Sequence, residues 1–88
     1  MIKITPKTLK RHELIGLECK VVHASNPEII GIEGIVIDES KNMITIESDK
    51  KVLIPKRNAI FQFELEESVT VDGKHIIGRP EDRVNLRR

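Results

Sequence analysis

Side chains that could serve catalysis or hold a metal ion are few and far apart in this sequence. Three histidines stand at wide spacing: His12, His23 and His75. None belongs to a metal-ligand pattern, and one cysteine, Cys19, is too few for a cysteine-based zinc site. Asp38 and Glu39 are adjacent, and adjacent residues of a β-strand face opposite sides, so their carboxylates should diverge. We therefore expect neither catalytic residues nor a metal site in the chain.

Lysine and arginine side chains are stronger candidates, because clusters of them attract the phosphate groups of RNA. The predicted RNA-binding residues lie in three clusters: Lys7, Lys10 and Arg11; Lys56 and Arg57; and Arg79, Arg83, Arg87 and Arg88. The sequence has no Trp or Tyr, and its two phenylalanines, Phe61 and Phe63, alternate with polar residues in a way that predicts core positions. Without exposed aromatic rings for stacking, we expect recognition of RNA backbone and shape.

Charges alternate in blocks along the chain, although the net charge is only +1. The blocks are +3 for residues 1–20, −4 for 21–39, +3 for 40–58, −4 for 59–72 and +3 for 73–88. A fold that gathers the basic blocks would have a basic face for RNA and an acidic face for a protein partner. Candidate partner-binding residues on the acidic face are Glu33, Asp38 and Glu39. The alternative, that the blocks only keep the surface hydrated, stays open.

Length and composition limit the class of protein. The 88 residues are 39% hydrophobic and 33% charged, which predicts one domain over 1–88 with a modest core. A single cysteine cannot form an internal disulfide, so a reducing compartment is expected. The first residues are not those of a signal peptide, and no apolar run has membrane-spanning length. We expect a soluble, cytoplasmic protein.

The sequence patterns at the two ends of the chain predict other structures than the pattern of its middle. Thr5 as N-cap and Pro6 in the first turn predict a short helix over about 5–15, ended by Gly16. The basic residues of about 78–88 predict a helix or an arm that orders on binding. Between them, over about 17–77, the period changes to two and predicts a barrel of five or six short strands.

Particular residues define the predicted strands and turns. One strand places Leu17, Cys19, Val21 and His23 on a single face, with Cys19 as a small buried or half-buried apolar side chain. Gly31 and Gly34 predict a sharp bend or bulge, the feature that lets a small sheet curl. Three further residues or pairs mark turns and strand ends. We expect Asn42 as a candidate for the left-handed conformation, Pro55 at a strand end, and Asp72-Gly73 as a hairpin loop.

These elements together predict a mostly β fold, a small and strongly bent antiparallel barrel. The periodicity alone fits SH3-like, Sm-like and OB-type barrels and does not choose among them.

Six short segments, in order, carry a resemblance to a known family. They are HELIG (His12–Gly16), VHASNP (Val22–Pro27), GIEGIVIDESKN (Gly31–Asn42), IPK (Ile54–Lys56), FQF (Phe61–Phe63) and GRPEDR (Gly78–Arg83). This series resembles the ribonuclease P protein family called component 1 in archaea, which has an Sm-like barrel and eukaryal relatives. The resemblance spans about residues 8–83. Members of that family often have a longer N-terminal arm and a more basic C-terminal extension than this sequence.

The resemblance implies an accessory subunit of an RNA-based endonuclease that removes the 5′ leader from precursor tRNA. In such an enzyme the RNA holds the catalytic magnesium ions, so the chain itself would bind no cofactor and contain no active site. Its expected partners are the ribonuclease P RNA, a zinc-ribbon-type protein subunit, other ribonuclease P proteins and, through the holoenzyme, precursor tRNA. The HELIG segment with His12, the GIEG bend and the GRPEDR segment are the expected contact regions. A protein-protein adaptor barrel in another ribonucleoprotein is the alternative.

Overall fold

The computed structural model describes residues 13–65 and 67–79, and these form a mostly β structure. The elements are β1 (Glu18–Ala24), the 3-10 helix η1 (Pro27–Ile29), β2 (Glu33–Glu39), β3 (Met43–Glu47), β4 (Lys51–Pro55), β5 (Ala59–Glu64), β6 (Ser68–Asp72) and the 3-10 helix η2 (Gly73–Ile76). All neighbouring strands are antiparallel, in the order β4-β3-β2-β1-β5-β6. The predicted bent antiparallel sheet is therefore present.

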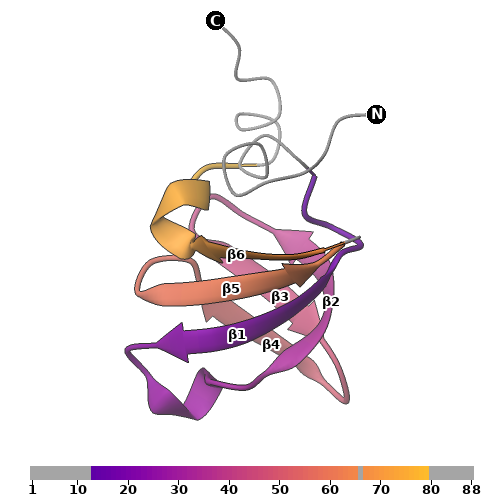
Figure 1. Ribbon diagram of the computed structural model, residues 1–88, viewed down its shortest axis with the longest axis horizontal. Helices are drawn as coiled ribbons and strands as arrows, with labels where there is room; N and C mark the ends of the chain where they lie inside the picture. The colour runs from indigo at the N-terminus through magenta and orange to yellow at the C-terminus, as the bar shows by residue number, and fades with distance from the viewer. Residues whose placement is uncertain (1–12, 66, 80–88) are drawn as a thin grey trace, which may run out of the picture.

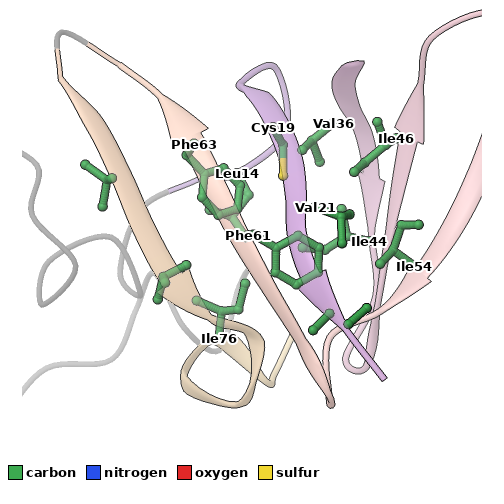
Figure 2. Close-up of a cluster of buried hydrophobic side chains, with 14 residues drawn as sticks. Leu14, Cys19, Val21, Val36, Ile44, Ile46, Ile54, Phe61, Phe63 and Ile76 are labelled. Atoms are coloured by element: carbon green, nitrogen blue, oxygen red, sulfur yellow. The ribbon is translucent and has the colours of Figure 1, made fainter. Parts of the chain in front are cut away.

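The bend of the sheet creates the core. In Figure 1, β1, β5 and β6 lie in front of β2, β3 and β4, so that one surface of the sheet faces inward from both halves. Phe61 and Phe63 are fully buried there, with ring centroids 6.1 Å apart, as their alternation predicted. Figure 2 shows Val21, Ile44 and Ile54 pointing into the same space. Cys19 is also buried, again as predicted.

Pro55 ends β4, which is an edge strand of the sheet. The backbone N–H of the next residue, Lys56, donates to the carbonyl of Asn42, so the nitrogen of Pro55 faces the open edge. Proline has no N–H to donate, and an edge position costs it no ladder hydrogen bond. The prediction that Pro55 stands at a strand end is confirmed.

Two bulges change which side chains face the core. The register of β1 with β5 shifts between Val21 and His23, and as a result His23 is exposed while Ala24 is buried. The prediction that His23 shares the inner face of Leu17, Cys19 and Val21 is wrong, because a bulge inserts one residue and reverses the alternation beyond it. A second shift, between Val36 and Asp38, turns Asp38 outward and Glu39 inward. The two carboxylates diverge, as predicted.

Some local predictions differ from the structure. Of the predicted helix over about 5–15, residues 13–15 are described and are not helical; the rest of it, and tail residues 80–88, lie outside the described residues. Asp72-Gly73 is not a hairpin loop: the Asp72 carboxylate accepts the backbone N–H of Lys74 (3.1 Å) and caps η2. Among the non-glycine residues that the structure describes, Asn58 (φ 68°) has the left-handed conformation and Asn42 does not. None of the helices in 13–65 and 67–79 is long and apolar enough to cross a membrane.

Gly34 lies where two strands approach too closely for a side chain. A Cβ at Gly34 would collide with the backbone carbonyl of Glu47 and would lie 3.1 Å from the side chain of Ile46. Because backbone atoms of the neighbouring strand cannot move aside cheaply, the close approach requires glycine.

We predict that Gly34→Ala lowers the free energy of unfolding by about 2 kcal/mol, because overpacking forces the strands apart. Urea denaturation followed by circular dichroism measures the change. Glu33→Ala, at the exposed neighbouring position, is the control and should change stability by no more than about 0.5 kcal/mol. Equal stability of the two variants would show that the strands can separate at no cost.

Candidate nucleic-acid interface

Lys56 and Glu39 form a buried ion pair at one end of the sheet. The Nζ of Lys56 lies 2.7 Å from Oε2 of Glu39, and both side chains are 0% exposed. The sequence predicts Lys56 as an RNA-binding residue and Glu39 as a partner-binding residue. The structure corrects both placements, because each charge is turned inward and held by the other. A buried charge requires such a partner, since desolvation without one costs several kcal/mol.

Lys56 also connects segments that are far apart in the sequence. Its ammonium group donates to the carbonyl of Gly78 (2.8 Å), and its backbone N–H donates to the carbonyl of Asn42 (2.8 Å). The N–H of Gly78 in turn donates to the carbonyl of Lys41 (2.8 Å). Gly73 packs against the carbonyl of Lys56 so closely that a Cβ there would collide with it. The β2–β3 turn, the end of β4, η2 and the segment after η2 therefore meet at Lys56.

Four exposed basic residues surround this junction, and we refer to them as the basic end. They are Lys41, Arg57, Lys74 and Arg79. The carbonyl of Lys41 is itself part of the junction. Arg57, Lys74 and Arg79 each directly follow a junction residue, namely Lys56, Gly73 and Gly78. Within the described part of the chain, none of the four side chains forms an ion pair. Their charges are thus available to phosphate groups, for which guanidinium and ammonium groups are suitable donors.

The structure brings together only part of the predicted RNA-binding set. Arg57 and Arg79 are exposed and lie at the basic end. Lys41 and Lys74 were missed by sequence reasoning, because isolated lysines give no signal until the fold places them beside other cations. The remaining candidates lie outside the described residues: Lys7, Lys10, Arg11, His12, Arg83, Arg87 and Arg88.

Four carboxylates lie on the outward surface of the central strands, which we refer to as the acidic face: Glu18, Glu33, Glu47 and Glu64. Two exposed lysines share this surface, Lys20 opposite Glu33 and Lys51 opposite Glu47. Glu18 and Glu64 are directly opposite each other on β1 and β5. Like charges in directly opposed positions destabilise a sheet, so a basic partner would relieve this repulsion. Ile35, 40% exposed, lies beside Glu18 on β2 and adds an apolar contact area. Of the predicted partner-binding residues, Glu33 lies on this face and Asp38 is also exposed.

Two observations on the described residues concern metal binding and nucleophilic chemistry. Among the residues it describes, no group of three or more His, Cys, Asp or Glu side chains could hold a metal ion. Cys19 is 2% exposed, and burial raises the pKa of its thiol from 9.0 to about 12. A thiol in that environment stays protonated at neutral pH and is a poor nucleophile.

Comparisons with known proteins agree on one family. The family model for ribonuclease P/MRP, subunit p29, matches residues 7–86. The chain is 50% identical to ribonuclease P protein component 1 of Haloarcula marismortui over 82 residues, which cover 91% of this chain and 87% of that protein. It is 49% identical to the protein of the same name from Methanocaldococcus jannaschii over 84 residues, covering 92% and 88%. A solved structure described as a homologue of human RNase P protein Rpp29 matches with a TM-score of 0.61 and 40% identity, covering 83% of this chain and 99% of that one.

We predict that Lys56→Met lowers the free energy of unfolding by about 3 kcal/mol, because it leaves the buried Glu39 carboxylate without its ammonium partner. Replacing both residues, as Lys56→Met with Glu39→Leu, should recover most of the loss. Urea denaturation measures both variants, and Lys51→Met on the exposed side of β4 is the control. If the double variant is no more stable than the single one, the ion pair is not the source of the loss.

We predict that the Cys19 thiol of the folded protein does not react with a coloured disulfide reagent at pH 9, and reacts at once in denaturant. Burial raises the pKa of the thiol from its ordinary value of 9.0 to about 12, so the thiol's contribution to stability is complete below pH 9 and is lost between pH 9 and 12. Reaction rates with and without urea check the first part, and the pH dependence of unfolding checks the second. Rapid modification of the folded chain would contradict the burial.

Proposed function

Because this chain belongs to the ribonuclease P/MRP subunit p29 family, we propose that it holds the RNA of ribonuclease P at the basic end. It is a protein subunit of an endonuclease that, in this proposal, removes the 5′ leader from precursor tRNA. The catalytic magnesium ions belong to the RNA, and the chain contributes RNA binding and RNA folding. The strong bend of the six-stranded sheet supports the Sm-like barrel that the family resemblance implies.

The observation that carries this proposal is the set of four cations around a neutralised lysine. The Lys56–Glu39 pair adds no net charge to the surface, while Lys41, Arg57, Lys74 and Arg79 remain exposed beside it. Four cations within one end of a small domain provide the phosphate contacts that position RNA without reading its sequence. Both phenylalanines are in the core, so base stacking on them does not contribute. The binding should therefore weaken strongly with salt.

The acidic face supports a second contact, with a protein subunit. The opposed Glu18 and Glu64 carboxylates and the exposed Ile35 match a partner segment that carries basic and aliphatic side chains. We propose that a protein subunit of ribonuclease P, of the zinc-ribbon type, contacts this face. RNA and protein would then occupy different surfaces of one domain. The cytoplasmic location stays a prediction.

We predict that reconstituted cleavage of precursor tRNA, with the ribonuclease P RNA and partner proteins, slows several-fold at limiting magnesium when this chain is left out. The double substitution Lys41→Gln with Arg79→Gln should also slow cleavage, by less than omission of the chain does, because it removes two cations of the basic end. Lys50→Gln with Lys51→Gln makes the same charge change at the opposite end of the β3–β4 hairpin and is the control. Cleavage that depends neither on the chain nor on the basic end would overturn the proposal.

A further inference from the structure

A pocket of about 300 Å³ opens at the basic end, where Arg57 and Lys74 line it together with residues outside every predicted site, among them His23, Ile60 and Asp72. Its lining includes Ile60 of β5, flanked by His23 of β1 and Asp72 of β6. These three residues are paired across neighbouring strands, His23 with Ile60 and Ile60 with Asp72, so they form one row. His23 reaches this row because the bulge in β1 turns it outward. Bulges often redirect a side chain toward a functional surface in this way.

The rim of the pocket is polar and is held in place by the backbone. Arg57 and Asn58 come from the β4–β5 turn, where Asn58 has the left-handed conformation. The carbonyl of Asn58 accepts the N–H of Ser25 (3.0 Å), which ties this turn to the end of β1. Lys74 lines the other side, on η2. A rim anchored at both sides is organised before a ligand arrives, which reduces the entropy lost on binding.

The pocket has two cations, Arg57 and Lys74, and one carboxylate, Asp72, which would bind different groups of a ligand. Arg57 and Lys74 form no side-chain hydrogen bond or ion pair within residues 13–65 and 67–79, so both can contact an anion. One oxygen of Asp72 accepts the N–H of Lys74 (3.1 Å). After this one bond the Asp72 carboxylate can still accept further hydrogen bonds, but only from a ligand group that donates a proton. A phosphate offers no proton, whereas a hydroxyl group does.

We propose that this pocket binds one phosphate–ribose unit of the RNA backbone. Arg57 and Lys74 contact the phosphate, the ribose lies on Ile60, and the 2′-hydroxyl donates to the Asp72 carboxylate. Asp72 then makes the contact that distinguishes RNA from DNA, since only RNA has the 2′-hydroxyl. The pocket lining contains no Phe, Tyr or Trp, and its one ring is the imidazole of His23; the two cations and the carboxylate around it favour the backbone over a base. The inference rests on the proposed function, because it assumes that RNA is the ligand of this end of the domain.

The test uses the shortest ribonuclease P RNA fragment that the full chain protects in a footprint, and a DNA strand of the same sequence. Fluorescence anisotropy measures both affinities over a range of salt. Arg57→Gln should weaken RNA binding about tenfold, the effect of losing one charge-assisted hydrogen bond. It should also lower the slope of log affinity against log salt by about 0.7 to 0.9, as expected for one lost phosphate contact. Lys50→Gln, the same charge change at the far end of the β3–β4 hairpin, should change neither.

Asp72→Ser tests the ribose contact separately. Serine keeps an oxygen to cap η2, so folding should be preserved, and thermal melting checks this. The RNA-to-DNA affinity ratio should fall toward one, because serine has a single oxygen, which caps η2, and the second carboxylate oxygen that would accept the 2′-hydroxyl is lost. A general loss of negative charge would instead strengthen RNA and DNA binding equally and leave the ratio unchanged, which would overturn the ribose contact.

The outcomes separate this inference from the function on which it rests. If the wild-type chain binds the RNA fragment and Arg57→Gln binds it with the same affinity and salt slope, the pocket is excluded and the RNA-binding function stands. Chemical shifts of the backbone amides of His23 and Asn58 provide an independent measure. They should move on titration with RNA, and unmoved signals with bound RNA would also exclude the pocket. Failure of the wild-type chain to bind the RNA at all would contradict the proposed function itself.

Discussion

The buried pair of Lys56 and Glu39 is the interaction on which the arrangement of this domain depends. The 2.7 Å contact connects Glu39, at the end of β2, with Lys56, which follows β4. The ammonium group of Lys56 also donates to the carbonyl of Gly78 and so holds the segment after η2. An ammonium group has three donors in tetrahedral directions, which suits it to join strands that do not pair with each other. Because a buried charge is costly without its partner, these segments are strongly coupled.

The pair exists because β2 contains a bulge. Without the register shift between Val36 and Asp38, strict alternation would place Asp38 inward and Glu39 outward. The bulge in β1 has the matching effect on the other half of the sheet, where it turns His23 to the surface. Each bulge therefore contributes to the curvature of the sheet and also selects which ionisable side chain is buried and which is offered to a ligand.

Charge separation follows from the same geometry. The ends of β4 and β6 meet at Lys56, so basic residues of the β2–β3 turn, the β4–β5 turn and η2 gather at one end of the sheet. The carboxylates of β1, β2, β3 and β5 remain on the outward surface of the central strands. A chain with net charge of only +1 therefore has cations at one surface and carboxylates at another, which is the separation that the proposed contacts with RNA and with a basic protein segment require.

The sequence by itself determined the features that depend on local alternation and on turn chemistry. Phe61, Phe63 and Cys19 were identified as core, a bent antiparallel sheet was predicted, and six ordered motifs pointed to the ribonuclease P family that the comparisons then showed. The tertiary structure alone decided that Lys56 is buried, that His23 is exposed and that Lys41 and Lys74 join the arginines. Those outcomes depend on bulges and on contacts such as Lys56 with Glu39, 17 residues apart, and a register shift between strands leaves no periodic signal in either strand.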